Sequence, residues 1–560
     1  MFKYIILLIF IPISVFSQNN QIQLFANNKS QFGISTNNKI IENKVADIIA
    51  NNFYLLTNYR LPILKSKLTS NNIIINKIIK IGDDEYLRIR TDNSDIFIEG
   101  TNDEYLEYAA YTFLENYLGI HFYIPEEKFI PKKAEIYINK NLDIKEIPDF
   151  KHRQYWFFGS LVPSEEFLKW NKLHSYKTDT DFGMYMVHNI EEFIPDNLIY
   201  KYPEFFAFKN NKRVTDQLDF TNDKLSKYFI ERVKVWIKNN PNLNTIPINP
   251  KDNELYCNCL KCETTSNRYG SKMAAFLYLI NKVAKEFPNK KFIIQAYKSN
   301  RKPPVNFKLQ HNIYFVISDI EINRLKGVQN DISNNALRFK EDLSDWNKLT
   351  PNILIWDYIT WHDSSFIPFP TIKPLAENLR YFIKKSQGMF LEGDGGIVAF
   401  QHKLKPYLAA KLMWDTNKDA DEIIKEFYQF YYGDASDIMF NYYSLIDKNL
   451  VKYKNIDTNG SENFYKDAAS KYLSSKNISD YKKIIANAKI IVKNNKKILD
   501  RIEVEEIGLL IVELEISKYV NKTKPDNKKV NKLKQKLENM QLGTYNTYLQ
   551  SFDLFFSELN

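Results

Sequence analysis

Between about residues 150 and 418, short apolar segments alternate with amphipathic helical patterns, and this alternation limits the possible folds most strongly. The eight candidate strands are Arg153–Phe158, Gly183–His188, Gln217–Phe220, Asn244–Asn249, Lys291–Tyr297, Ile313–Asp319, Ile353–Tyr358 and Gly388–Glu392. Helical patterns between them are Ser164–Leu173, Asp223–Lys238, Ser271–Phe287, Asn334–Lys348, Ile372–Lys385 and Leu404–Trp414. Strands and helices in this number predict a (β/α)8 TIM barrel over residues 146–418. A doubly wound α/β sheet also alternates, but the Gly-rich phosphate-binding turn of that fold is missing.

Two further regions flank the predicted barrel. Residues 18–145 mix strands with one amphipathic helix, from about Asn102 to Leu118 with Gly119 as its C-cap, which predicts a separate α/β domain. Its candidate strands are Asn72–Ile75, Tyr86–Arg90, Asp95–Glu99 and Ala134–Ile138. Residues 419–560 are predicted to be helical, as a structural brace or a dimer interface. Their candidate helices are Ala420–Tyr432, Ala435–Asn449, Ser479–Asn495, Ile502–Val520 and Asn531–Met540.

The N-terminus has the parts of a secretory signal. Lys3 precedes an apolar run from Tyr4 to Val15, and Ser17 supplies a small residue at the junction. The run is short for a membrane span, so a cleaved signal over residues 1–17 is favoured over an uncleaved anchor. No later stretch is apolar enough to span a membrane. We therefore expect an exported bacterial protein, periplasmic or secreted, with no integral span after cleavage.

Charge and aromatic content narrow the functional classes. Lys and Arg exceed Asp and Glu by 77 to 67, but the lysines are spread along the chain. The densest basic segment, Lys518 to Lys536, is typical of a solvated helix end, and nucleic-acid motifs are absent, so no nucleic-acid partner is expected. The 36 Tyr and 39 Phe residues instead leave carbohydrate as a candidate partner.

Carboxylates, amides and aromatic residues recur where the predicted strands end. A TIM barrel builds its active site at this edge, and the mixture suits sugars, whose hydroxyls need polar partners and whose apolar faces stack on rings. Glycosidic cleavage commonly uses two carboxyl groups, one protonated and one ionised. The candidate catalytic residues are Glu392, Asp357 and Asp252. The candidate substrate-binding residues are His188, Asn189, Asp219, Tyr297, Asp319, Tyr358 and Trp361.

Each of these residues also has a simpler interpretation. A strand-end carboxylate is often a helix cap, a turn former or half of a salt bridge, and His188 could equally be a satisfied core histidine. His362 is predicted to be a loop residue near the mouth of the pocket. A Ser/His/Asp hydrolase is not supported, because the chain has no Gly-x-Ser-x-Gly segment. No cofactor is required for the predicted chemistry.

All three cysteines fall in one C-x-C-x-x-C segment, formed by Cys257, Cys259 and Cys262. This spacing suggests a structural zinc, although a closed zinc site normally needs four ligands, so the fourth would be a distant His or carboxylate. One disulfide with an odd thiol, or three reduced thiols, are the alternatives. In each case the segment is expected to stiffen the loop that carries Asp252 and Glu254.

Several motifs resemble known families. The segment 108–120, Tyr-Ala-Ala-Tyr-Thr-Phe-Leu-Glu-Asn-Tyr-Leu-Gly-Ile, resembles the N-terminal domain of alpha-glucuronidases and beta-hexosaminidases, which precedes a catalytic barrel in several glycoside hydrolases. The stretches 249–262, Trp356–Tyr358 and Ala409–Asp415 resemble an uncharacterised family of exported, glycoside-hydrolase-like bacterial barrel proteins described as a domain of unknown function. The resemblance covers roughly residues 85 to 440.

This sequence departs from the family pattern at two positions. Asn253 follows Asp252 where Gly is usual, and Asp219 stands where a Cys is common. The resemblance implies an exported glycoside hydrolase acting on a polysaccharide or oligosaccharide fragment. If the substrate carries a uronic acid, Lys251 or Arg324 could pair with its carboxylate. A non-catalytic glycan-binding protein that keeps the barrel pocket, and a structural or adhesin-like surface protein, are the alternatives.

Overall fold

The computed structural model describes residues 20–559 apart from 66, 68–69, 158–160, 176–186, 454–455 and 459. The predicted signal segment 1–17 and most of the predicted strand Gly183–His188 lie outside the described residues. The chain divides into two compact units, Met1–Pro148 and Asp149–Asn560.

The first unit is built on a mixed six-stranded sheet with the strand order β10-β5-β6-β4-β2-β3. Its strands are β2 (Gly33–Ser35), β3 (Ile63–Leu64), β4 (Asn72–Lys77), β5 (Leu87–Asp92), β6 (Asp95–Gly100) and β10 (Asp143–Glu146). Two small antiparallel pairs complete the unit: β1 (Gln21–Phe25) with β9 (Ile136–Asn139), and β7 (His121–Ile124) with β8 (Glu127–Phe129). The prediction of an α/β region is confirmed.

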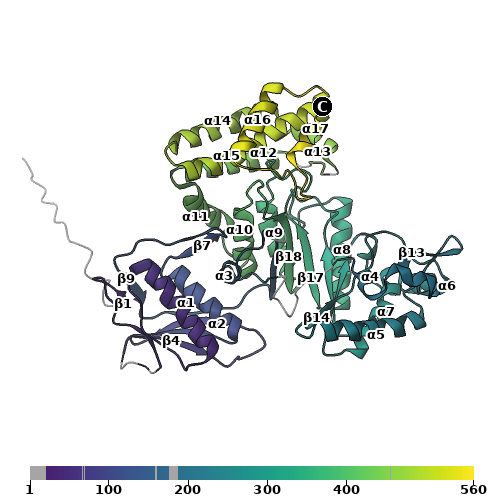
Figure 1. The fold of residues 1–560 in the computed structure, drawn as a ribbon, viewed down its shortest axis with the longest axis horizontal. Helices are drawn as coiled ribbons and strands as arrows, with labels where there is room; N and C mark the ends of the chain where they lie inside the picture. Colours follow the sequence, from purple (N-terminus) through teal and green to yellow (C-terminus); the bar gives the residue numbers. More distant parts are fainter. Residues whose placement is uncertain are drawn as a thin grey trace, which may run out of the picture. The chain divides into compact units, whose positions relative to one another are not determined.

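Helices α1 (Ile40–Thr57) and α2 (Asp103–Asn116) lie side by side on this sheet (Figure 1). The Asn102 side chain caps α2 by accepting a hydrogen bond from the Tyr105 N–H at 2.9 Å. The chain leaves the helix through Gly119, whose φ of 71° is left-handed and favours glycine. Both ends of the helix therefore lie where the sequence predicted them.

The second unit contains six parallel strands in the order β11-β18-β17-β16-β15-β14. They are β11 (His152–Phe157), β14 (Thr245–Pro247), β15 (Lys291–Ala296), β16 (Ile313–Ser318), β17 (Ile353–Tyr358) and β18 (Gly388–Gly395). The four central strands are almost wholly buried, as parallel strands covered on both faces must be. Because the first strand pairs with the last, the sheet has the connectivity of part of a barrel.

The complete eight-stranded barrel is not found among the described residues. The third predicted strand, Gln217–Phe220, is wrong as a barrel strand: β13 (Lys212–Leu218) instead pairs antiparallel with β12 (Phe206–Lys209) in a hairpin. The reason is visible in β13, where Lys212, Arg213 and Asp216 remain wholly or partly exposed. A parallel strand buried on both faces could not accommodate these charges.

Helices accompany the parallel strands as the sequence predicted. They are α3 (Glu165–Trp170), α5 (Asp223–Asn239), α7 (Met273–Glu286), α8 (Asn334–Leu349), α9 (Ile372–Phe382) and α10 (Leu404–Trp414). Two short helices that the pattern did not predict, α4 (Ile190–Phe193) and α6 (Leu260–Tyr269), lie near the hairpin (Figure 1). Phe315 of β16 packs on Trp346 of α8 with ring centroids 4.1 Å apart, which identifies the face of the sheet that the helices cover.

The rest of the second unit is helical, as predicted. It comprises α11 (Ala420–Tyr432), α12 (Ser436–Val451), α13 (Ser461–Ala469), α14 (Ser475–Ile491), α15 (Lys496–Ile516), α16 (Asn527–Asn539) and α17 (Phe552–Glu558). The sequence pattern missed α13 and α17. Gly508 of α15 lies against the loop after β17, where a Cβ atom would stand 2.2 Å from the Phe366 carbonyl oxygen. The helices and this loop are therefore closely packed.

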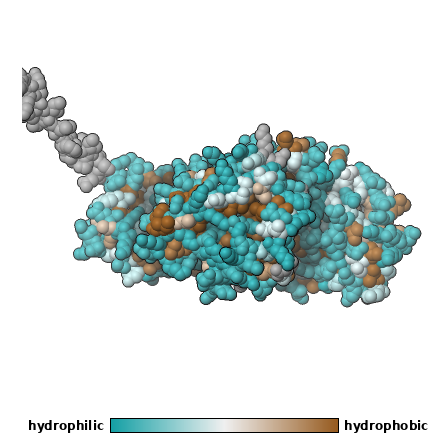
Figure 2. Space-filling model, turned by 90° about the horizontal axis from the view of Figure 1, so that it is seen from above, coloured by the Kyte–Doolittle hydropathy of each residue, from teal (hydrophilic) through white to brown (hydrophobic). Residues whose placement is uncertain are grey.

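The surface in Figure 2 is mostly hydrophilic, with hydrophobic residues in separate groups. Within the part of the chain that the structure describes, no helix combines the length and the apolar character needed to cross a membrane.

Candidate active site

The carboxyl ends of β17 and β18 carry a group of aromatic side chains around one carboxyl group. Trp356 is paired in register with Phe390, and Tyr358 with Glu392. Paired residues on adjacent strands point to the same face, and successive residues alternate between faces. Glu392 therefore shares a face with Trp356 and Tyr358. This face is opposite the one that α8 and α9 cover.

A hydrophobic floor underlies this group. The buried residues that form it are Ile293, Val316, Leu354, Trp356, Tyr358 and Phe390. The partly buried Trp156, Tyr314 and Ile320 pack against it. The floor thus combines aromatic rings, which can receive the apolar face of a sugar, with an environment that disfavours charge.

Glu392 is held by direct contacts. The Trp356 Nε1–H donates a hydrogen bond to Glu392 Oε2 at 2.7 Å, and the Tyr358 hydroxyl also hydrogen-bonds to the carboxyl group. The Glu392 side chain is only 14% exposed. Burial raises its pKa to about 7, against the opposing effects of the Trp356 hydrogen bond, the Arg324 charge and the Tyr358 hydrogen bond. A carboxyl group with this pKa can donate a proton near neutral pH.

His362 extends the group on the side of the C-terminal helices. Its Nε2 lies 3.6 Å from Glu392 Oε1 and has no hydrogen-bond partner among the described residues. Its Nδ1 lies 2.8 Å from the Thr547 Oγ1. Burial, together with the charges of Arg324 and Lys405, lowers the His362 pKa to about 3, so the imidazole is neutral. A neutral ring with one free nitrogen is suited to hydrogen-bonding a hydroxyl group.

Two residues on separate loops complete the surroundings of Glu392. The Arg324 guanidinium lies 5.1 Å from the centroid of the Tyr358 ring and donates a hydrogen bond to the Thr360 carbonyl at 3.2 Å. The Tyr548 ring centroid is 6.2 Å from that of His362, and Tyr548 is 65% exposed. The charges of Arg324 and Glu392 both act on the Tyr548 hydroxyl. Tyr548 therefore presents an open aromatic face beside the buried carboxyl group.

The structure does not bring Asp357 together with Glu392. Asp357 alternates with Trp356 and Tyr358 and so points to the helix-covered face, where its Oδ2 accepts a hydrogen bond from Asn378 of α9 at 3.1 Å. It is 2% exposed and hydrogen-bonds to Asp319, which is 1% exposed. Burial and the Asp357 charge raise the Asp319 pKa well above its usual range. These two predicted site residues therefore form a buried, proton-sharing pair behind the strands.

The third predicted carboxylate, Asp252, belongs to a separate group at the end of β14. Its side chain is 58% exposed, and its Oδ1 lies 3.9 Å from His188 Nε2. The His188 Nδ1 is 3.0 Å from the Pro250 carbonyl oxygen, and the His188 and Tyr297 ring centroids are 5.7 Å apart. His188, Asp252 and Tyr297 are thus brought together, as the sequence predicted for strand-end residues.

The side chains of three other predicted site residues contact other parts of the protein. The Asn189 amide links the Pro247 carbonyl and the Asn249 N–H at 2.8 and 2.9 Å, which ties its segment to β14. Trp361 is 4% exposed and stacks on Phe464 of α13 at 4.7 Å. Asp219 lies among the cysteines rather than near Glu392. The uronic-acid candidate Lys251 is paired with Asp196 at 2.7 Å and with Glu191 at 2.6 Å.

Sequence reasoning did not select Trp356, Thr547 or Tyr548. Trp356 could have been predicted from the sequence, because the two-residue alternation of a strand places Trp356 and Tyr358 on one face and Asp357 on the other. Thr547 and Tyr548 lie in a segment without a motif, and nothing in their local sequence connects them with His362.

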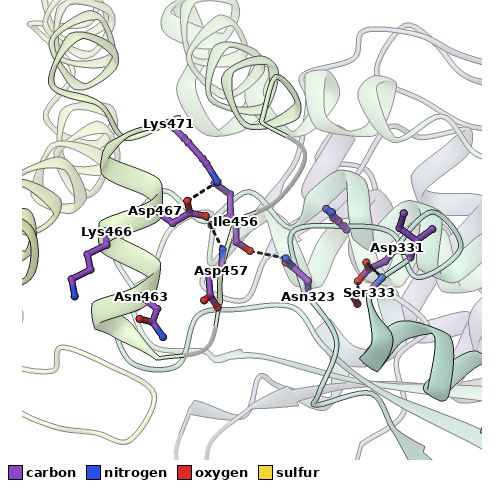
Figure 3. Close-up of a pocket in the computed structure, with 11 residues that line it drawn as sticks. Asn323, Asp331, Ser333, Ile456, Asp457, Asn463, Lys466, Asp467 and Lys471 are labelled. Carbon is purple, nitrogen blue, oxygen red and sulfur yellow. Dashed lines mark hydrogen bonds and ion pairs between the residues drawn. The ribbon is translucent and has the colours of Figure 1, made fainter.

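A cavity of about 650 Å³ lies apart from the predicted residues, between the loop after β16 and the segment around α13 (Figure 3). In it the Asn323 amide donates to the Ile456 carbonyl at 2.8 Å, and Asp467 pairs with Lys471 at 2.6 Å. Its lining residues are Asn323, Lys326, Asp331, Ile332, Ser333, Ile456, Asp457, Asn463, Lys466, Asp467 and Lys471. Three lysines and three aspartates are among these residues, so the cavity lining carries charges of both signs.

Glycoside hydrolases are among the solved structures with a similar fold. A family GH115 4-O-methyl-alpha-glucuronidase with specificity for decorated arabinogalactans is 9% identical, with a TM-score of 0.55 over 93% of this chain and 76% of the other. The Clostridium perfringens protein CpGH89, solved with its substrate GlcNAc-alpha-1,4-galactose, is 11% identical with a TM-score of 0.50. That match covers 85% of this chain and 61% of CpGH89, so this chain spans less than two thirds of it. At these identities the likeness shows a shared fold.

Sequence comparison identifies the family. No curated protein matches the chain. Residues 122–444, which include the parallel sheet, Glu392 and the cysteine segment, match a family described as a domain of unknown function, DUF4838. Because this match covers more than half of the chain, the protein belongs to the DUF4838 family.

Proposed function

We propose that the protein is an exported glycoside hydrolase that cleaves a polysaccharide or oligosaccharide, with Glu392 as the general acid. The supporting observation is the position of Glu392. Its carboxyl group is nearly buried, lies on the hydrophobic floor that includes Trp356 and Tyr358, and has a pKa of about 7. Such a group is protonated in a large fraction of molecules at neutral pH and can protonate the leaving oxygen of a glycosidic bond. The fold shared with glycoside hydrolases supports the same class.

Asp252 is the proposed ionised partner of Glu392. The parallel strands β14 and β18 end at the same edge of the sheet, so residues that follow them share this edge. Asp252 is also the most exposed of the three predicted carboxylates. Three strands, each about 4.8 Å from the next, lie between β14 and β18, so the sheet does not hold Asp252 directly against Glu392 as the nucleophile of a retaining enzyme would be held. We therefore expect an inverting reaction, in which Asp252 would activate a water molecule.

The surrounding residues would position the sugar. The free His362 Nε2 and the Tyr358 hydroxyl face Glu392, and the exposed Tyr548 ring can stack on a pyranose. Arg324 provides a positive charge for an acidic sugar, whereas the Lys251 charge is already neutralised. An acidic glycan is therefore the preferred substrate class.

A screen of the purified mature chain against acidic and neutral oligosaccharides, with product analysis, tests the proposal. Glu392→Gln removes the acidic proton and keeps the shape of the side chain, so it should abolish turnover and preserve binding. Asp357→Asn is the matched control on the adjacent strand, and it should remain active because Asp357 points away from Glu392. If Glu392→Gln hydrolyses the substrate as fast as the wild type, Glu392 is not the acid.

A non-catalytic glycan-binding protein is the second candidate. It is favoured by one observation: among the residues that the structure describes, no second carboxylate contacts Glu392 directly. This candidate predicts saturable oligosaccharide binding without products for the wild type and for both variants. Export is tested separately by mass spectrometry of the protein from the extracytoplasmic fraction, which should begin at Gln18.

A further inference from the structure

The three cysteines and Asp219 form a compact cluster remote in sequence from the glutamate site. The ligand atoms of Asp219, Cys257, Cys259 and Cys262 all lie within 4.8 Å of one another. Asp219, Cys257 and Cys262 are buried, and Cys259 is partly buried. All three cysteines are free thiols in the structure. We propose that Cys257, Cys259, Cys262 and Asp219 bind one structural Zn²⁺ ion.

The donor set fits zinc in number and in kind. Structural zinc is tetrahedral with Zn–S distances of about 2.3 Å, which place two sulfur ligands about 3.8 Å apart. The cluster needs only a small contraction from its present spacing to reach that geometry. Asp219 supplies the fourth ligand that the C-x-C-x-x-C segment lacks. Four protein ligands leave no open position, which is typical of a structural rather than a catalytic site.

Three chain segments supply the ligands, and their geometry arises locally. Asp219 follows the β12–β13 hairpin, Cys257 belongs to the loop after β14, and Cys259 and Cys262 begin helix α6. Cys259 is the N-cap residue of α6, and its Sγ accepts a hydrogen bond from the Cys262 N–H at 3.5 Å. One helical turn therefore brings two sulfur atoms to the same point.

The groups around the cluster also suit metal-bound ligands. The Phe208 N–H donates to Cys257 Sγ at 3.3 Å, and the Thr221 hydroxyl lies 3.2 Å from Cys262 Sγ. Arg213 donates to Asp219 Oδ2 at 2.9 Å, and Asp219 Oδ1, which accepts from the Thr221 hydroxyl at 3.1 Å, lies 3.3 Å from Cys262 Sγ. Such outer hydrogen bonds orient metal ligands. In the bound state, the ion would replace the thiol protons between these atoms.

The ion would stabilise the loop that carries Asp252. Gln217 donates hydrogen bonds to the Lys251 carbonyl and to Asn253 Oδ1, both at 3.0 Å, and so joins the end of β13 to this loop. Cys257 follows a few residues later on the same loop. Zinc would therefore attach this loop to the end of the hairpin at Cys257, in addition to the attachment that Gln217 provides at Lys251 and Asn253. This role is independent of whether the protein hydrolyses glycans.

Metal analysis of the full mature chain, purified without chelator, tests the proposal. We expect one zinc per chain, protection of all three thiols from alkylation, and a lower melting temperature after chelation. Cobalt substitution should produce the thiolate-to-cobalt charge-transfer band and the visible bands of a tetrahedral site. The control is the triple variant Cys257→Ser, Cys259→Ser, Cys262→Ser. Wild-type zinc content equal to that of this control would overturn the proposal, as would an intact mass showing a disulfide.

Variants of Asp219 separate a metal ligand from a simple ion-pair partner of Arg213. Asp219→Asn should weaken zinc affinity at least about tenfold, because substitution of groups that only support ligands already costs that much. Asp219→Cys breaks the ion pair with Arg213 but supplies a fourth thiolate, so it should restore or increase the affinity. If Asp219→Cys loses zinc as Asp219→Asn does, Asp219 is not a ligand. The zinc content of the wild type shows whether the cluster binds zinc even if a variant does not fold.

Discussion

Thr547 Oγ1 lies 2.8 Å from His362 Nδ1, although the two residues are 185 positions apart in the chain. The Thr547 N–H also approaches the His362 carbonyl, at 3.4 Å. The C-terminal segment thereby holds the imidazole in the orientation that turns its Nε2 towards Glu392. A region predicted to be a structural brace or a dimer interface therefore contributes directly to the candidate site.

Removal of the Thr547 hydroxyl should impair the site without unfolding the protein. In Thr547→Val the His362 ring loses the hydroxyl group that contacts its Nδ1. The orientation and the tautomer of the neutral ring are then no longer fixed by that contact. We expect kcat to fall about tenfold, because the hydrogen bond that orients the His362 ring contributes about 1 kcal/mol and a barrier higher by about 1.4 kcal/mol slows a reaction tenfold. Steady-state kinetics on the substrate found by the screen provide the measurement. An unchanged kcat would show that His362 needs no orientation.

Tyr548 should contribute to binding rather than to chemistry. Its exposed ring lies beside His362, so Tyr548→Ala removes a stacking surface but no titrating group of the reaction. We expect KM to rise several-fold while kcat changes little. Tyr548→Phe keeps the ring and is the matched control. Equal KM values for the Ala variant and the wild type would exclude stacking at this position.

The pH dependence of activity should respond to Trp356. If protonated Glu392 is the acid, activity is present below a pH of about 7 and declines as the pH rises through that value. The Trp356 hydrogen bond stabilises the ionised carboxylate and lowers the Glu392 pKa, so Trp356→Phe should raise it. The alkaline limb of the kcat/KM profile should then move to higher pH. A shift to lower pH would contradict the assignment of Glu392 as the acid.

The Asp319–Asp357 pair should make folding stability fall with increasing pH. Burial raises the pKa of both carboxyl groups above the unfolded value of about 3.9. The folded protein therefore binds more protons than the unfolded chain, and this stabilisation is present at acid pH and lost as the pH rises through the folded pKa values. Asp357→Asn removes one acid from the pair.

Urea unfolding at pH 5 and pH 8 measures this effect. Asp357→Asn should lose less stability between the two pH values than the wild type, by roughly 1 kcal/mol, the equivalent of about one pKa unit. Asp252→Asn, which changes an exposed carboxylate, is the control and should follow the wild type. An equal pH dependence in wild type and Asp357→Asn would mean that the pair does not share a proton.

Trp361 should matter for stability and not for sugar binding. Its ring is enclosed by Phe369 and Phe464, with centroid distances of 5.3 and 4.7 Å. Trp361→Ala should reduce the free energy of unfolding by about 3–5 kcal/mol, as is typical for a buried aromatic residue. Trp361→Phe should retain most of the stability and all of the substrate affinity. Weaker substrate binding by a fully folded Trp361→Phe variant would show that Trp361 does contribute to the substrate site.

The fold was predictable where local pattern and burial agree. The apolar segments that became β15 to β18 have the continuous hydrophobicity of strands covered on both faces, so their type and order could be deduced. The segment Gln217–Phe220 is shorter and follows charged residues, and its pairing was decided by β12 rather than by the parallel sheet. Hydrophobic pattern indicates that a strand forms, but it does not specify the partner.

The candidate site was predictable in part for the same reason. The sequence by itself determined which polar residues follow the strands, and so identified Glu392, Tyr358 and the group of His188, Asp252 and Tyr297. Only the tertiary structure decided that Asp357 and Asp319 face the helices, that Asp219 joins the cysteines, and that Thr547 and Tyr548 reach Glu392's surroundings. These relationships depend on packing between segments far apart in the chain, and local residue patterns carry no information about such contacts.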